Sequence, residues 1–283
     1  MRIYQKGMKV LGAASLLAFS LASGSALAGI ANSKHDLSTA STSTSKSATG
    51  TTEICVFCHT PHGSATASAG PLWNRGASAA VYTSYANPDS MDSTNLTPSS
   101  SSLACLSCHD GTVAVDILIN QPGSGGYTAG GASAGYTWTS GLGGIDNTTK
   151  MLKSGIVTNL TNDLTNDHPI GVAYCGGFKA AGGCVDGDFF TAALVKNGTA
   201  TGASPGNGVA GDKWWIDAAL GTALTRDKTD VILYARNFTT NANPGVQPSV
   251  ECASCHNVHD PANGTFLRMS NASSALCLTC HNK

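Results

Sequence analysis

Regular alternation of hydrophobic and polar positions is rare in this chain. Residues 112–120 alternate loosely and are rich in Val and Ile, and residues 231–234 have a similar pattern. Both stretches predict short strands. Residues 189–196 predict a helix that Asn197 and Gly198 would end. The remaining sequence shows few regular elements.

Two stretches have a biased composition. Residues 38–52 are rich in Ser and Thr, and residues 123–144 are rich in Gly, with Tyr127, Tyr136 and Trp138 spaced through them. Both predict surface loops or linkers. In the whole chain 33 of 283 residues are Gly, 12% are charged and 6% are aromatic. Such a chain would bury little apolar surface by itself.

The first 28 residues have the regions of a secretory signal peptide. Three basic residues precede the mostly apolar residues 10–21, and residues 26–28 (Ala-Leu-Ala) give a cleavage site, so that the mature chain begins at Gly29. The apolar run is shorter than the ~20 residues of a membrane span, and no later stretch is long enough. The first cysteine is Cys55, so no lipoprotein anchor is predicted. The formal net charge of −1 indicates neither nucleic acid nor an acidic membrane surface as a partner.

The motif Cys-x-x-Cys-His occurs four times. The four copies are Cys55/Cys58/His59, Cys105/Cys108/His109, Cys252/Cys255/His256 and Cys277/Cys280/His281. This is the attachment motif of haem c. Two thiols add across the two vinyl groups of one haem, and the adjoining imidazole binds the iron as its proximal ligand. The sequence therefore predicts four covalently attached haems.

Cys-x-x-Cys pairs also hold zinc or iron–sulfur clusters and act as redox pairs. Histidine fills only 8 of 283 positions, so its presence after all four pairs is not an accident of composition. The haem interpretation assigns eight of the ten cysteines. The other two, Cys175 and Cys184, are predicted to form a disulfide in an exported protein, with free thiols and pairing to another chain as alternatives.

Four haems in 283 residues leave little chain around each macrocycle, so we expect the haems to form the core. Covalent attachment would organise the chain as disulfides or metals do in small domains. The predicted fold class is a haem-organised multihaem cytochrome c, mostly irregular coil with short helices at the motifs and few short strands. Trp214 and Trp215 are expected in ordinary packing, with a haem face as the alternative.

Four haems offer eight axial positions, and the chain contains eight histidines. Besides the proximal histidines, the candidate distal ligands are His35, His62, His168 and His259. Because the number of histidines equals the number of axial positions, the sequence predicts two histidine ligands for every iron. Three methionines, Met91, Met151 and Met269, are alternative axial ligands, but none has a comparable placement.

His62 and His259 each follow a proximal histidine by three residues, in the longer motif CxxCHxxH. On one helical turn the second imidazole cannot reach the far face of the same haem, but it can reach an adjacent haem. His35 precedes the first pair of motifs and His168 precedes the second pair. The same order, one histidine, then CxxCHxxH, then CxxCH, therefore occurs twice. This order pairs His35, His62, His168 and His259 with the first, second, third and fourth haem.

Three aspartates, Asp110, Asp167 and Asp260, lie next to histidines of this set. We interpret them as groups that orient imidazoles or tune potentials, because the sequence shows no separate catalytic constellation.

The same segments resemble the doubled CxxCH multihaem c-type cytochromes. The similarity lies in residues 34–38 (KHDLS), 53–63 (EICVFCHTPHG), 167–171 (DHPIG) and 267–283 (LRMSNASSALCLTCHNK), and is weak through the Gly-rich middle. In the order and number of motifs the chain is most similar to the tetrahaem outer-surface cytochromes of metal-reducing bacteria. Those proteins polymerise into extracellular filaments with a continuous haem stack.

The resemblance implies a subunit of a cytochrome nanowire with bis-histidine haems. Electrons would enter from other cytochromes or outer-membrane conduits and leave to extracellular acceptors such as metal oxides. In such filaments one axial histidine comes from the neighbouring subunit, and His35, close to the predicted mature N-terminus, is the favoured candidate. A head-to-tail contact of this kind does not close and therefore propagates.

Two other interpretations stay open. A soluble periplasmic carrier would need all eight ligands in one chain, and a multihaem reductase would need one iron with an open position. Eight histidines fill all eight axial positions of four haem irons, so no iron has an open position and no enzyme activity is predicted. The expected domains are a leader over 1–28 and a tetrahaem cytochrome over 29–283, with units at about 29–120 and 160–283 joined by the Gly-rich residues 121–159.

Overall fold

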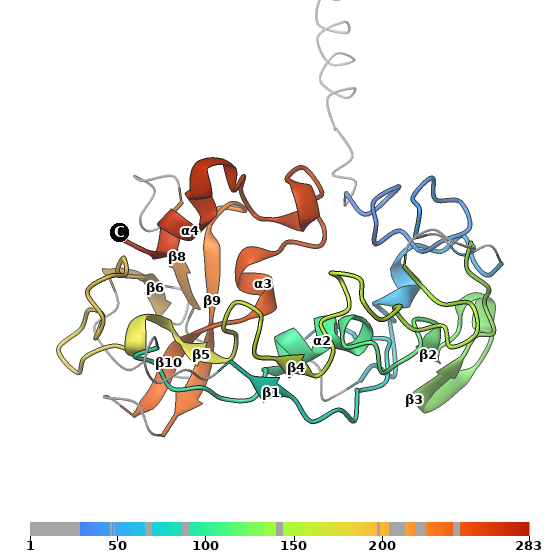
Figure 1. Cartoon of the computed structure of the whole chain (residues 1–283), viewed down its shortest axis with the longest axis horizontal. Helices are drawn as coiled ribbons and strands as arrows, with labels where there is room; N and C mark the ends of the chain where they lie inside the picture. Colours follow the sequence, from blue (N-terminus) through green and yellow to red (C-terminus); the bar gives the residue numbers. More distant parts are fainter. Residues whose placement is uncertain are drawn as a thin grey trace, which may run out of the picture.

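The computed structural model describes residues 29–45, 47, 49–65, 70–85, 91–139, 144–196, 199–203, 213–218, 225–239 and 244–282. The predicted leader, residues 1–28, lies outside these ranges. Most of the described chain is irregular and is interrupted by short helices and short strands (Figure 1). The prediction of a mostly irregular fold with short regular elements is confirmed.

The largest regular element is a six-stranded sheet in the C-terminal half, on the left of Figure 1. Its strand order is β5, β10, β9, β8, β6, β7, and all neighbouring strands are antiparallel. The bounds are β5 (Val172–Ala173), β6 (Ala193–Lys196), β7 (Thr199–Ala203), β8 (Lys213–Ile216), β9 (Val231–Phe238) and β10 (Gly245–Val250). The strand predicted at residues 231–234 is the first half of β9.

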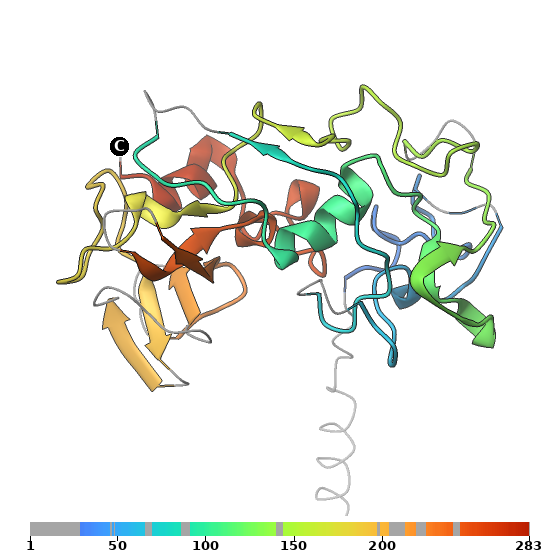
Figure 2. The ribbon, with the colours of Figure 1, turned by 90° about the horizontal axis from the view of Figure 1, so that it is seen from below.

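Two smaller sheets complete the strand structure of the described chain. On the right of Figure 1, β2 (Ile117–Asn120) pairs antiparallel with β3 (Tyr127–Ser133), and β2 lies in the stretch 112–120 that predicted a strand. The parallel pair of β1 (Thr83–Ser84) and β4 (Asp163–Leu164) joins segments that are far apart in the sequence. Figure 2 shows this pair running along one side of the molecule between the two halves.

Each Cys-x-x-Cys-His motif lies at a short helix, as predicted. These helices are the 3-10 turn η1 (Cys55–Phe57), α2 (Ser100–His109), α3 (Cys252–Cys255) and α4 (Ala275–Cys280). Further 3-10 turns are η2 (Pro122–Ser124), η3 (Tyr174–Gly176), η4 (Gly264–Phe266) and η5 (Ala272–Ser274). Within the described ranges, no helix has the length and apolar character that crossing a membrane requires.

Each half has a hydrophobic cluster made of its own side chains. The C-terminal cluster includes Phe178, Trp214 and Leu233, which are 0%, 0% and 2% exposed. The N-terminal cluster includes Leu118 and Trp138, which are 0% and 2% exposed. The chain therefore supplies apolar clusters of its own, because the strands bury apolar side chains against the neighbouring loops.

Three local predictions are wrong. Residues 193–196 form strand β6 instead of the end of a helix, because pairing with β8 outweighs a weak local helix preference. Part of the Gly-rich stretch forms β3, and beyond it Tyr136 and Trp138 are buried, so this stretch is not simply a surface loop. In the Ser/Thr-rich stretch three serines are buried: Ser38, Ser41 and Ser47.

Trp214 and Trp215 lie buried in β8, in ordinary packing.

A buried carboxylate joins the helices of the second and third motifs. Glu251, directly before α3, accepts hydrogen bonds from Nη1 of Arg236 (2.8 Å), Oγ of Ser102 (2.6 Å) and the backbone N–H of Ser99 (3.2 Å). The Glu251 side chain is 0% exposed and that of Arg236 is 19% exposed. Because Ser99 and Ser102 lie at the start of α2, this carboxylate fixes α2 against α3.

Replacing Glu251 with Ala should lower the free energy of unfolding by about 3 kcal/mol, because a largely buried guanidinium loses its partner charge and two donors lose their acceptor. Denaturant titration of the haem-loaded protein measures the change. Lys228→Gln is the control, since Lys228 pairs with Asp260 at the exposed surface and its loss should leave the unfolding midpoint unchanged. Equal shifts in the two variants would contradict the role given to Glu251.

Candidate functional site

The four motifs are numbered here in chain order as sites 1 to 4. Their eight cysteines are free thiols in the structure: Cys55, Cys58, Cys105, Cys108, Cys252, Cys255, Cys277 and Cys280. Because the two cysteines of a motif are three positions apart on a helical turn, they lie on one face of it. The histidine follows at the end of the same turn, so each site gathers two thiols and one imidazole.

The thiols of sites 1, 2 and 3 lie next to one another. The Cys105 thiol of site 2 is within hydrogen-bonding reach of Cys252 of site 3, and burial adds to the raised pKa of Cys105. Burial raises the pKa of Cys58 in site 1 to about 12, and the nearby Cys108 of site 2 adds to this shift. Site 2 therefore lies between site 1, whose Cys58 is near both cysteines of α2, and site 3, whose Cys252 is near Cys105.

Site 4 continues this series beyond site 3. Burial raises the pKa of Cys255 in site 3, and its neighbours in site 4 include Cys277. Burial likewise raises the pKa of Cys280 to about 12, with Cys255 nearby. His281 of site 4 packs against the ring of Phe189, with ring centroids 4.4 Å apart. The four sites thus follow one another in space in the order 1, 2, 3, 4.

Backbone carbonyl groups orient three of the proximal imidazoles. The Nδ1 to oxygen distances are 2.6 Å for His59 and Pro71, 2.7 Å for His109 and Thr158, and 2.9 Å for His256 and Thr265. A carbonyl oxygen only accepts hydrogen bonds, so each Nδ1 carries the hydrogen and Nε2 of the neutral ring keeps its lone pair. This tautomer is the one that binds a metal through Nε2.

Sites 1 and 3 place these carbonyls with the same local architecture. After each motif the chain turns back and pairs with it, through bonds from Thr60 N to Leu72 O (2.8 Å) at site 1 and from Asn257 N to Phe266 O (2.7 Å) at site 3. The returning residues Leu72 and Phe266 both have positive φ values, 53° and 60°. The internal repeat read from the sequence is therefore visible in the backbone of these two sites.

At site 2 a distant segment supplies the carbonyl. Residues 152–160 return to the end of α2, where Leu160 N donates to His109 O (2.7 Å). Gly111 ends this helix with a φ of +67°, and a Cβ atom there would clash with the side chain of Asn159. Only glycine combines this φ with such a close approach, so Gly111 allows Thr158 to reach the imidazole.

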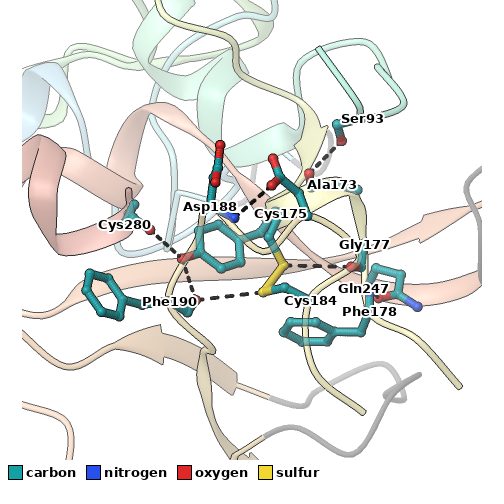
Figure 3. Close-up of a disulfide and its surroundings, with 12 residues drawn as sticks. Ser93, Ala173, Cys175, Gly177, Phe178, Cys184, Asp188, Phe190, Gln247 and Cys280 are labelled. Atoms are coloured by element: carbon teal, nitrogen blue, oxygen red, sulfur yellow. Dashed lines mark hydrogen bonds between the residues drawn. A yellow bond between two sulfur atoms is a disulfide. The ribbon is translucent and has the colours of Figure 1, made fainter. Parts of the chain in front are cut away.

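Hydrogen bonds from residues next to the disulfide between Cys175 and Cys184 fix the position of site 4. Cys175 and Cys184 are joined by a disulfide with Cα atoms 5.5 Å apart (Figure 3). The hydroxyl of Tyr174 donates to the carbonyl oxygens of Phe190 (2.7 Å) and Cys280 (3.3 Å), and Phe190 N donates to Cys280 O (3.0 Å). These bonds attach the residues that flank the loop to Cys280 in the last turn of α4. Figure 3 shows Phe190 and Cys280 beside the disulfide.

Two candidate distal histidines face proximal imidazoles of this chain. The ring centroids of His35 and His109 are 6.0 Å apart, and those of His59 and His259 are 6.1 Å apart. The order of motifs in the sequence pairs His35 with site 1 and His259 with site 4. The structure instead places His35 at site 2 and His259 at site 1.

The distal candidates differ in exposure. Burial lowers the pKa of His35 to about 4, and partial burial together with the nearby His59 lowers the pKa of His259. Both rings are therefore neutral near pH 7, the form that binds a metal. His62, His168 and His259 are exposed, and Nδ1 of His168 lies 3.0 Å from the carbonyl oxygen of Pro169.

Of the three aspartates that the sequence singled out, Asp110 and Asp260 bond to groups other than imidazoles. Asp110 accepts from the hydroxyl of Tyr82 (2.7 Å), and Asp260 pairs with Lys228 (2.9 Å). Oδ2 of Asp167 is buried without a hydrogen-bond partner among the described residues, and burial raises the pKa of this carboxyl. Backbone carbonyls do the orienting instead, and no sequence signal marks them because every residue has one.

These residues fit haem c. Each site offers two thiols and one imidazole, three of these imidazoles present Nε2 in the metal-binding form, and sites 1 and 2 have a second imidazole opposite the first. In the described part of the chain no three His, Cys, Asp or Glu side chains come together as zinc or iron–sulfur sites require. The class of protein that these sites define is a multihaem c-type cytochrome.

Comparison with known proteins supports this class. Residues 246–283, which contain sites 3 and 4, match the family model described as the doubled CXXCH motif. No curated protein matches the chain. The matched motif indicates covalent haem c and is typical of electron-transfer proteins.

Replacing Cys175 and Cys184 together with Ser should lower the free energy of unfolding by about 2–3 kcal/mol, the contribution expected of a disulfide that closes a short loop. Thermal unfolding of the haem-loaded protein gives the shift in midpoint. A reductant should lower the wild-type midpoint to that of the variant and leave the variant unchanged. Equal midpoints for the two oxidised proteins would show that the loop needs no covalent closure.

Proposed function

We propose that this chain is a tetrahaem electron-transfer protein that polymerises head to tail into a conductive extracellular filament. The observation that best supports electron transfer is the series of adjacent thiols through sites 1, 2, 3 and 4. Haems attached at these cysteines would be neighbours in the same order. Electrons could then pass through the whole protomer without a diffusing carrier.

Bound haem c supplies the one-electron chemistry. The cysteines would hold it covalently, and the proximal imidazoles, three of them fixed by carbonyl groups, would bind its iron. A second histidine ligand would leave no position for a substrate, which suits electron transfer and argues against catalysis at the iron. The proposed distal set is His35, His62, His168 and His259.

The exported protein should carry four haems per chain, because four motifs offer complete attachment sites. The haem content is measured from the pyridine haemochrome spectrum and from the mass of the intact chain. Replacing Cys55 and Cys58 with Ser should remove one haem and leave three. A wild-type chain with fewer than four covalent haems would contradict the tetrahaem assignment.

In the proposed filament one axial ligand crosses between protomers, as the resemblance to filament-forming cytochromes implies. The sequence favours His35, but its ring lies 6.0 Å from that of His109 in the same chain. Three candidates, His62, His168 and His259, are exposed, and His168 fits best, since its Nδ1 bonds to a carbonyl and leaves Nε2 available at the surface. His62 follows site 1 as His259 follows site 3, and His259 faces a site of its own chain. We therefore assign the crossing to His168.

In this proposal the protein is secreted to the outer cell surface. Other cytochromes or outer-membrane conduits supply its electrons, and extracellular acceptors such as metal oxides receive them. The signal peptide predicted over residues 1–28 and a disulfide, which forms in oxidising compartments, support export.

His168→Ala should prevent filament formation without lowering the number of covalent haems. Electron microscopy of protein sheared from the cell surface tests the first effect, and the haemochrome spectrum tests the second. His62→Ala is the matched control, in which we expect filaments with one altered haem per protomer. Discrete wild-type particles would favour the soluble carrier, and an open iron in the wild type would favour a reductase.

A further inference from the structure

The two facing pairs of imidazoles have the spacing of a shared iron. A bond between a metal and an imidazole nitrogen is about 2 Å long, and the ring centre lies about 1 Å beyond that nitrogen, so two rings on opposite sides of one iron have centres about 6 Å apart. The observed separations are 6.1 Å for His59 and His259 and 6.0 Å for His109 and His35. The interplanar angles of 18° and 83° are both compatible with axial ligation, which does not fix the relative rotation of the rings.

We propose that sites 1 and 2 take their distal ligands from distant parts of the chain. His259, from the turn after site 3, closes site 1, and His35, from the N-terminal arm (residues 29–45), closes site 2. This inference rests on the proposed binding of haem c. It replaces the order-based pairing, in which His35 serves site 1 and His259 serves site 4.

The N-terminal arm fixes the turn that carries His259. Gly29 N donates to the carbonyl oxygen of His259 at 2.9 Å. A Cβ atom on Gly29 would lie 2.5 Å from Cδ of Pro261, so the arm approaches this turn as closely as a glycine allows. The ring of His35 stacks on Phe266, with centroids 4.4 Å apart, and Phe266 lies in the returning segment of site 3. Two contacts between the arm and the chain around site 3 therefore position both distal histidines.

The arm also fixes its own histidine. Asp36, only 2% exposed, accepts hydrogen bonds from Asn32 N (2.7 Å) and from the hydroxyl of Ser38 (2.7 Å). Nδ1 of His35 is buried without a hydrogen-bond partner among the described residues. Packing against Phe266 and the turn around Asp36 therefore orient this ring, whereas a carbonyl orients the proximal ring of His109.

With His259 at site 1 and His35 at site 2, the haem sites of the N-terminal half depend on residues and contacts of the C-terminal half. Site 1 takes its thiols and proximal imidazole from the N-terminal half and its distal imidazole from the C-terminal half. Site 2 is closed by an arm that is docked on site 3. Removal of the C-terminal motifs would therefore open the haem of site 1, although every residue of its own motif is still present.

The test combines each histidine variant with loss of one haem. His259→Ala alone should convert one low-spin iron to high spin, as measured by electron paramagnetic resonance and visible absorption. In a Cys55→Ser/Cys58→Ser background, which lacks the haem of site 1, the same substitution should convert no further iron. In a Cys277→Ser/Cys280→Ser background it should still convert one. His35→Ala should likewise lose its effect only in a Cys105→Ser/Cys108→Ser background.

His62→Ala is the matched control, because His62 occupies the same place in the other CxxCHxxH motif. It should still convert one iron in the background that lacks the haem of site 1. The opposite pattern, with His259→Ala silent only when the haem of site 4 is missing, would restore the order-based pairing and overturn the proposal.

If a haem-deficient variant does not fold, a structure of the haem-loaded wild-type protein identifies the distal ligands of sites 1 and 2 directly. Iron 1 between His59 and His259, and iron 2 between His109 and His35, would support the proposal. Any other distal ligand on either iron would overturn it. Four haems with different pairs would contradict this inference alone, whereas fewer than four haems would contradict the proposed function.

Discussion

The hydrogen bond between Nδ1 of a proximal imidazole and a backbone carbonyl is the constraint on which the arrangement of the sites depends. It requires that a second piece of chain return to sites 1, 2 and 3 and present a carbonyl at the correct place. The chain turns sharply at these places, with positive φ values at Leu72 and Phe266 in the returning segments and at Gly111 at the end of α2. A chain that must do this repeatedly cannot continue as long helices or strands, which explains the large irregular fraction better than composition alone.

The serial order of the sites follows from how two short helices pack. Glu251 binds Ser99 and Ser102 at the start of α2 and Arg236 of β9, and it directly precedes α3. With the helices held in this way, Cys105 and Cys252 come within hydrogen-bonding reach. A buried ion pair is weak evidence for added stability, but it is well suited to fixing one arrangement against others. Here the arrangement that it fixes is the junction between the two doubled motifs.

Much of the candidate site could be predicted from the sequence because attachment chemistry needs adjacent residues. Spacing alone identified the thiols, the proximal histidines and the short helices that carry them. Pairings between distant residues, such as His259 with His59, depend on how the halves fold together, and the order of motifs does not encode that. The carbonyls of Pro71, Thr158 and Thr265 leave no sequence signal. The sheet was underestimated because its strands are short and their pairing, as between β6 and β8, is nonlocal.

The separate hydrophobic core of the C-terminal half gives sites 1 and 4 different kinds of support. Site 4 is held by hydrogen bonds from residues that flank the disulfide loop, and that loop belongs to a cluster that includes Trp214 and Phe178. Its position therefore depends on protein packing and on one covalent link. Site 1, in the proposed pairing with His259, depends on a ligand from the other half. In the proposed filament, a site at the end of the protomer would need support that does not depend on a neighbouring protomer, whereas an internal site would rely on ligands of its own chain.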